Sequence, residues 1–225
     1  AHMSDWMFAL VRTDFSGDKH EGITYLLIDL HSPGIEIRPI VQISKDRGFN
    51  EVFFDEVRVP LTNVVGEIHH GWKVAHSSLG HERGTHFLAR QIGIQRLIHR
   101  LFRSFREKYP FYGGTEVDRF VDLAAEVCAL KALSYRAVSR SAQGQSGAET
   151  SITKLFWSEL QQEIFNVAIE EEGVFAAFDD DPEYGLDGQW QLGYLRSRGA
   201  TIGGGTSEIQ RNVIAERILG MPRDS

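Results

Sequence analysis

The sequence predicts an α+β protein in which a portion of an antiparallel β-domain, residues 1–70, precedes a four-helix bundle, residues 71–225. The first observation is a change of hydrophobic pattern near Gly71. Short runs rich in aromatic and β-branched residues give way to long segments with apolar residues every three or four positions. The second observation is composition: the 225 residues are 42% hydrophobic and 24% charged, as is ordinary for one large or two small globular domains.

Before Gly71, several segments are short, apolar and bounded by turn-like residues, as β-strands are: 6–12, 23–30, 35–40 and 51–59. In the last of them Val57 and Val59 fall on one side of the chain, and Pro60 ends the ladder. We therefore expect four or five antiparallel strands in a sheet or barrel.

After Gly71 the apolar spacing predicts helices. The longest, from Trp72 to Lys108, has a stripe made of Ile94, Leu97, Ile98, Leu101, Phe102 and Phe105. The next, capped near Thr115, has the series Val117, Val121, Ala124, Ala125 and Cys128. The third has Ile152, Leu155, Phe156, Leu160, Ile164 and Val167. A short helix from about Leu186 and a last helix from Thr206 to Leu219 complete the set, and their lengths suggest an antiparallel bundle.

Net charge and residue counts exclude several function classes. A formal charge of −7 does not favour nucleic acid or an anionic membrane, and no apolar run approaches the roughly 18 residues of a membrane span. The single cysteine, Cys128, excludes an internal disulfide and fits a reducing compartment. The nine histidines lack the spacing of a zinc site. We therefore expect a cytoplasmic protein with no metal and with no nucleic-acid or membrane partner.

The stretch RSRGATIGGGTSEIQRNVIAERILG, residues 196–220, places three glycines before a helix. Such a position suits an anion, because unpaired N–H groups and the helix dipole point toward it. A plain interhelical turn with a capped helix has the same pattern, and neither a Walker nor a Rossmann fingerprint is present. Spacing alone favours the turn, and a phosphate cradle stays open as the alternative.

A second candidate is LGHERGTHF, residues 79–87, early in the long helix. Gly80 and Gly84 lie on one helix face, where small residues let a ligand or another backbone come close, so Glu82 could face a cavity. The alternative is a solvated face with an adjacent charge pair, Glu82 and Arg83, and spacing alone favours this alternative.

Three segments together resemble the acyl-CoA dehydrogenase family. TIGGGTSEIQRNVIAERILGMPR is similar to the family's C-terminal signature. GITYLLIDLHSPGIEIRPI and EVFFDEVRVPLTNVVGEIHHGW resemble its middle β-domain and the passage into its C-terminal helical domain. The likeness runs from about Trp6 to Arg223, with the motifs in the family's order.

The resemblance implies a flavoprotein that oxidises an acyl-CoA thioester to the trans-2-enoyl-CoA, with FAD as cofactor and electron-transfer flavoprotein as electron acceptor. Family members hold FAD between the β-domain and the bundle, and a neighbouring subunit completes the site. We therefore expect self-association to a dimer or tetramer. The positions that match cofactor contacts are Gly205, Thr206, Ser207, Glu208 and Arg106.

The resemblance also directs attention to the catalytic base. Many relatives carry a glutamate where this chain has Gly204, which has no side chain and is left as a substrate-binding position. A minority place the base on the first long helix of the C-terminal domain, and the matching residue is Glu82, with Arg83 beside it as a substrate contact. Glu82 is thus the candidate that abstracts the α-proton, for which a desolvated carboxylate is suited.

Two stretches depart from the family's flavin-binding patterns: REKYPFYGGTE at 106–116 and IEEEGVFAAF at 169–178. The alternative function is therefore a non-catalytic partner subunit of a heteromeric acyl-CoA dehydrogenase, acting through oligomerisation. Family members are also about twice this length. We expect a piece that lacks the N-terminal helical domain, is inactive alone and binds FAD weakly or not at all. Stoichiometric yellow flavin in the purified protein would contradict this expectation.

Overall fold

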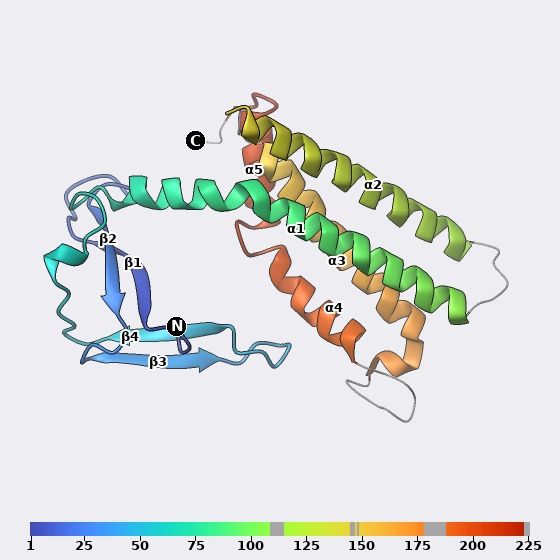
Figure 1. Cartoon of the computed structure of the whole chain (residues 1–225), viewed down its shortest axis with the longest axis horizontal. Helices are drawn as coiled ribbons and strands as arrows, with labels where there is room; N and C mark the ends of the chain where they lie inside the picture. The colour runs from blue at the N-terminus through green and yellow to red at the C-terminus, as the bar shows by residue number, and fades with distance from the viewer. Residues whose placement is uncertain (109–114, 145–146, 148, 178–187, 223–225) are drawn as a thin grey trace. The chain divides into compact units, whose positions relative to one another are not determined.

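Strands near the N-terminus form two separate antiparallel hairpins in the computed structural model (Figure 1). Their bounds are β1 Trp6–Arg12, β2 Ile23–Asp29, β3 Ile35–Ile40 and β4 Phe49–Phe54. The structure describes residues 1–108, 115–144, 147, 149–177 and 188–222; within these ranges the side chains at 78–87, 108, 115–116 and 149 lie outside the description. The antiparallel β-region expected from the sequence is confirmed.

Register and turn contacts define each hairpin. In the first, Trp6 lies opposite Asp29, and the Arg12 guanidinium crosses the connecting loop to donate to the carbonyl of Lys19 at 2.7 Å. In the second, Ile35 lies opposite Phe54. The strand expected over 51–59 was too long: β4 ends at Phe54, because the next two residues turn the chain, Glu56 having a φ of 49°.

The helices that follow are one long element and four shorter ones: α1 Gly71–Lys108, α2 Thr115–Ala142, α3 Glu149–Glu172, α4 Gln189–Ala200 and α5 Ser207–Arg217. Two 3₁₀ segments, η1 Leu61–Asn63 and η2 Gly173–Ala177, lie between them. The first residue of α1, Gly71, is a glycine for a steric reason, since a Cβ there would lie 2.2 Å from the backbone nitrogen of Tyr25 on β2. No helix in the described part of the chain is long and apolar enough to cross a membrane.

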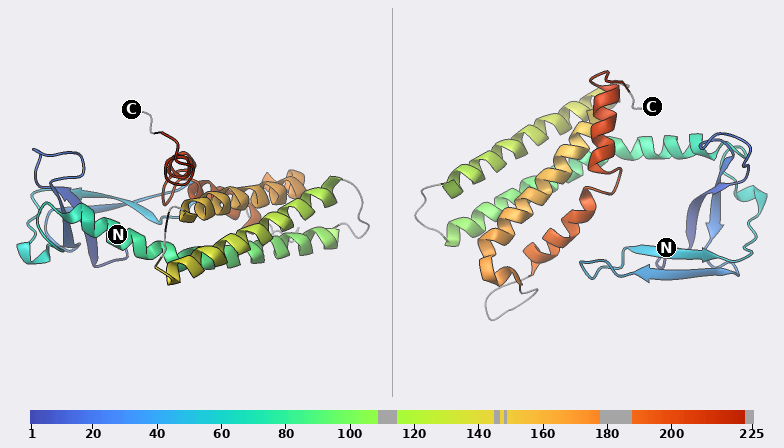
Figure 2. Two further views of the ribbon diagram at one scale, coloured as in Figure 1. Left: turned by 90° about the horizontal axis from the view of Figure 1, so that it is seen from above. Right: turned by 180° about the vertical axis from the view of Figure 1, so that it is seen from behind.

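The chain divides into two compact units, Ala1–Glu82 and Arg83–Ser225. The division falls inside α1, beyond the change of pattern at Gly71, from which the helical domain was expected to start. Helices α1, α2 and α3 run side by side in the second unit, with α4 alongside, as both views of Figure 2 show. The expected α+β fold with a helical bundle is therefore confirmed.

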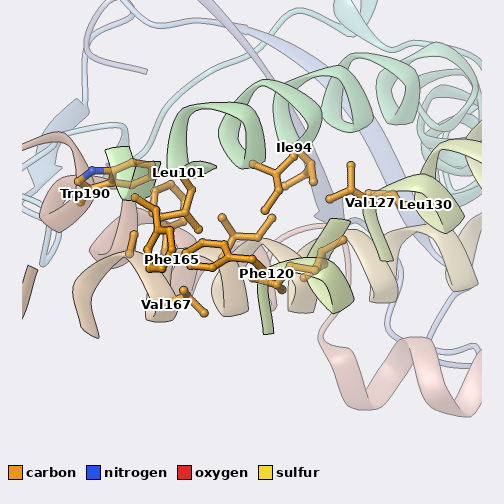
Figure 3. Close-up of a cluster of buried hydrophobic side chains, with 14 of the residues drawn as sticks. Ile94, Leu101, Phe120, Val127, Leu130, Phe165, Val167 and Trp190 are labelled. Carbon is orange, nitrogen blue, oxygen red and sulfur yellow. The ribbon is translucent and has the colours of Figure 1, made fainter. Parts of the chain in front are cut away.

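The core of the bundle consists of buried apolar side chains from four helices (Figure 3). Those labelled in the close-up are Ile94, Leu101, Phe120, Val127, Leu130, Phe165, Val167 and Trp190. The stripe predicted on α1 is the one that points inward. On α2, however, the inward face is formed by Phe120, Leu123, Val127 and Leu130, whereas Val121 and Cys128 of the predicted series are exposed. Helix α2 thus has two apolar stripes, and only one of them is buried.

Close packing and hydrogen bonds hold α4 against α3. A Cβ on Gly193 would lie 2.1 Å from Cε1 of the Phe165 ring, so the glycine lets the two helices approach. Nearby, the Arg198 guanidinium donates to Oδ1 of Asn166 at 2.6 Å. The Gln162 amide donates to the Ser197 carbonyl at 3.1 Å. These contacts fix the end of α4, from which the glycine turn departs.

Candidate functional site

The three glycines form a tight turn between α4 and α5. Gly204 and Gly205 have φ angles of 71° and 99°, a region that side chains disfavour. At Gly204 a Cβ would meet no atom within 4 Å, so the backbone conformation alone favours glycine there. At Gly205 a Cβ would lie 2.5 Å from Nε2 of Gln210, so packing adds to the constraint.

Gln210 ties the start of α5 back to this turn. Its side chain is 6% exposed, and its amide donates to the Gly204 carbonyl at 3.1 Å and to the Gly205 carbonyl at 3.5 Å. Because a buried amide needs such partners, the turn and the first helical turn of α5 support each other. Sequence reasoning missed Gln210, although its position four residues after Thr206, within the signature motif, was the available signal.

The N-terminus of α5 is capped by its own chain. Thr206 is the N-cap, and its Oγ1 accepts from the Ile209 N–H at 3.3 Å. The Ser207 N–H donates to the Thr201 carbonyl at 3.0 Å. These two N–H groups, of Ile209 and Ser207, lack an acceptor within the helix, so each bond occupies a group that a phosphate would need. At this helix start the structure therefore shows an interhelical turn with a capped helix, in which two of the first N–H groups already have acceptors within the chain.

The carboxylate of Glu208 is an ionised hydrogen-bond acceptor at the N-terminus of α5. Its own N–H, the Thr206 hydroxyl, and the positive charges of Arg211 and Lys154 hold the pKa of this carboxyl below its ordinary value. An ionised carboxylate accepts hydrogen bonds and repels anions, so the pair of Thr206 and Glu208 suits hydroxyl or amino donors. These two acceptors therefore suit the hydroxyl groups of a sugar or the amino group of a purine better than a diphosphate.

A buried lysine that sequence reasoning missed lies under the same helix start. Lys154 of α3 is 5% exposed and Ser207 of α5 is 6% exposed. Neither the Lys154 Nζ nor the Ser207 Oγ has a hydrogen-bond partner among the described residues. Burial lowers the pKa of Lys154, and the carboxylates of Glu159 and Glu208 oppose that shift. Glu159 also accepts from Arg211 of α5 at 2.6 Å, so charged side chains join α3 to α5 beneath the turn.

The other predicted site residues lie on α1. Glu82 and Arg83 belong to the helix, but their side chains fall outside the described residues. Arg106 is exposed near the C-terminal end of α1, where the rings of Phe105 and Phe120 contact each other at a tilt, with their centroids 4.2 Å apart. That end of the bundle is far from α5 (Figure 1). Within one protomer the structure thus brings Gly204 to Glu208 together and leaves Arg106 apart.

Comparisons with known proteins agree with this architecture. The chain is 36% identical over 225 residues to acyl-CoA dehydrogenase IpdE1 of Mycobacterium tuberculosis, covering 100% of this chain and 57% of that protein. Among solved structures, the Tcur3481–Tcur3483 steroid ACAD matches with a TM-score of 0.91 at 24% identity, over 99% of this chain and 58% of that one. The ChsE4–ChsE5 complex from Mycobacterium tuberculosis matches with a TM-score of 0.81 at 27% identity, over 99% and 59%. The chain therefore spans little more than half the length of the relatives it matches.

The family model for the acyl-CoA dehydrogenase C-terminal domain matches residues 69–219. This range includes α1, the bundle and the α4–α5 turn with its capped helix. The resemblance expected from the three sequence segments is confirmed, and the chain belongs to the acyl-CoA dehydrogenase family.

Proposed function

We propose that this protein takes part in the flavin-dependent α,β-dehydrogenation of an acyl-CoA thioester, with Glu82 as the base. The observation that carries the proposal is family membership over residues 69–219 combined with Gly204, which offers no carboxylate at the position where many relatives have one. A Cβ at Gly204 would meet nothing within 4 Å, so no described side chain takes the place of that carboxylate. Arg83, next to Glu82, is the proposed substrate contact.

FAD would supply the acceptor for the hydride that leaves the β-carbon. The Gly205 to Glu208 segment fits the adenosine end of this cofactor, because Thr206 and Glu208 are acceptors for ribose hydroxyls or the adenine amino group. Ser207 adds a buried hydroxyl without a partner among the described residues. Arg106 lies at the other end of the bundle, so a cofactor contact from Arg106 would belong to a different copy of the site. Electron-transfer flavoprotein is the proposed electron acceptor.

The test is Glu82→Gln in the full-length protein with any partner subunit. The panel contains straight-chain, branched and steroid-type acyl-CoA thioesters, and a ferricenium dye accepts the electrons. Loss of a general base lowers turnover by about 10²–10⁴-fold while bound flavin absorbance stays unchanged. Glu107→Gln is the matched control on the same helix, since Glu107 is exposed near its far end. If the Glu82→Gln variant keeps full turnover, Glu82 is not the base.

The second candidate is a non-catalytic subunit of a heteromeric dehydrogenase. It is favoured by the two-protein composition of the ChsE4–ChsE5 complex and by the altered stretches at 106–116 and 169–178. In that case Glu82→Gln leaves the activity of the assembled enzyme unchanged, whereas omission of this chain abolishes it. The two candidates therefore give opposite results in the same assay.

A further inference from the structure

Helix α3 carries three polar side chains that hold the segment leading from α4 into α5. Glu159, Gln162 and Asn166 are three and four residues apart, so they lie along one face of the helix. Glu159 accepts from the Arg211 guanidinium of α5 at 2.6 Å, and Asn166 accepts from the Arg198 guanidinium of α4 at 2.6 Å. Gln162 lies between these two contacts.

Gln162 makes three hydrogen bonds at the point where α4 ends. Its amide group donates to the Ser197 carbonyl at 3.1 Å and to the Thr201 hydroxyl at 3.0 Å. Its amide oxygen accepts from the Arg198 guanidinium at 3.3 Å. The last four carbonyls of a helix lack a donor within that helix, and Gln162 supplies one of them with a donor from α3.

Thr201 connects Gln162 to the start of α5. The Thr201 hydroxyl accepts from Gln162 and donates to the Arg198 carbonyl at 3.2 Å. The Thr201 carbonyl accepts from the Ser207 N–H at 3.0 Å, and the Ser207 side chain is 6% exposed. A continuous series of hydrogen bonds therefore leads from α3 through Thr201 to the first residue of α5.

The glycine turn depends on such contacts at its two ends. Between Thr201 and Thr206 the chain consists of one isoleucine and the glycines 203–205. Glycine has a wide choice of backbone conformations, so a run of three does not fix its own course. Thr201 is held by Gln162 at one end of the turn, and Gln210 binds the Gly204 carbonyl from the other end. The position of Thr206 follows from these two anchors.

We propose that Gln162 is a positioning residue for the adenosine end of the cofactor. By holding Thr201, and through it Ser207, Gln162 sets the place at which α5 begins. The acceptors Thr206 and Glu208 flank Ser207 and move with it. The proposal rests on the assignment of these two acceptors to adenosine in the proposed function, and it extends that site to a residue of α3.

The variant Gln162→Glu removes the two N–H donors and keeps the size of the side chain. A carboxylate only accepts hydrogen bonds, so it can still pair with Arg198 but places an oxygen against the Ser197 carbonyl. We expect the variant to fold, because the charged bond to Arg198 offsets part of the loss, while the end of α4 is displaced. Gln161→Glu is the matched control, since it makes the same change of charge about 100° around the helix.

Affinity for ADP, which contains the adenosine end of FAD, is the readout. It is measured on the full-length protein with any partner subunit, by the competition of ADP with FAD followed by flavin fluorescence. Gln162→Glu should weaken ADP about tenfold, as the loss of one hydrogen bond to an ionised group does. Affinity for FMN, which lacks adenosine, and both affinities in Gln161→Glu should change less than about twofold. A general loosening of the protein would weaken ADP and FMN together.

Thr201→Val tests the same connection from its other side, because valine keeps the branched shape and lacks the hydroxyl. This variant should also weaken ADP and not FMN. Both substitutions break one series of contacts, so the double variant should bind ADP about as the weaker single variant does. If Gln162→Glu does not fold, the ADP affinity of Thr201→Val decides the question.

The proposal is overturned if the folded Gln162→Glu variant binds ADP as tightly as the wild type, or if FMN weakens as much as ADP. It is also overturned if the effects of Gln162→Glu and Thr201→Val simply multiply. If ADP does not compete with FAD on the wild type, the assignment of Thr206 and Glu208 to adenosine fails as well. Turnover of Glu82→Gln is a separate assay, so each of these results leaves the assignment of the base untouched.

Discussion

Replacing Gly205 with alanine tests whether the α4–α5 turn depends on a missing side chain. A φ of 99° costs a non-glycine residue about 1–2 kcal/mol. The new Cβ would also lie 2.5 Å from Nε2 of Gln210, whose buried amide bonds to the Gly204 and Gly205 carbonyls. Displacing that amide leaves a buried polar group unpaired, at a cost of about 1–3 kcal/mol.

Part of this loss is offset, because alanine restricts the unfolded chain by about 0.4–1 kcal/mol. The net expectation for Gly205→Ala is a decrease of about 1–4.6 kcal/mol in the free energy of unfolding. Two glycines nearby serve as controls. Gly204 has a φ of 71° but open space, so Gly204→Ala should cost only about 1 kcal/mol. Gly199 lies within α4 in open space, so Gly199→Ala should stabilise the protein by about 0.5–1 kcal/mol.

The assay is urea unfolding followed by far-ultraviolet circular dichroism, with hydrogen exchange of the α5 amides as a local measure. The expected order of stability is Gly199→Ala above wild type, then Gly204→Ala, then Gly205→Ala. If Gly205→Ala and Gly204→Ala differ by less than about 0.5 kcal/mol, Gln210 does not constrain the turn as described. The reasoning about the missing side chain would then be refuted.

Two further substitutions test the packing and the buried charge. Gly193→Ala should destabilise the bundle by about 1–3 kcal/mol, because its Cβ would lie 2.1 Å from the Phe165 ring, and Phe165→Leu in the same chain should recover part of the loss. Lys154 has a lowered pKa in the folded state, so between its folded and unfolded pKa values the unfolded chain binds more protons and stability rises with pH. Lys154→Met should remove this rise in urea midpoints measured from pH 7 to 10, and an unchanged slope would contradict the burial of the ammonium group.

Local sequence patterns were sufficient to predict most of the fold. The aromatic and β-branched runs before Gly71 became two hairpins, and the stripe from Ile94 to Phe105 became the inward face of α1. Such periodicities depend on residues only a few positions apart, so they can be recognised in a linear chain. The end of β4 at Phe54 could not be recognised in this way, because it follows from the turn at Glu56, whose φ is 49°.

The residues of the candidate site were also predicted only in part from the sequence. The glycine turn and its Thr206 cap were evident as a motif, and so was the candidate base Glu82, which stays a prediction. Gln210 and Lys154 were not found, because their importance comes from burial against residues distant in sequence.

By itself the sequence determined the α+β class, the order of strands and helices, the family and the glycine turn before α5. Each depends on local spacing or on a motif that is contiguous in the chain. Only the tertiary structure decided which stripe of α2 is buried, that two of the opening N–H groups of α5 already have acceptors, and that Arg106 lies far from Thr206. The physical reason is that solvent exposure and hydrogen-bond satisfaction depend on which helices pack together. Two apolar stripes on one helix have the same spacing in the sequence, and only packing against a neighbouring helix distinguishes the buried stripe from the exposed one.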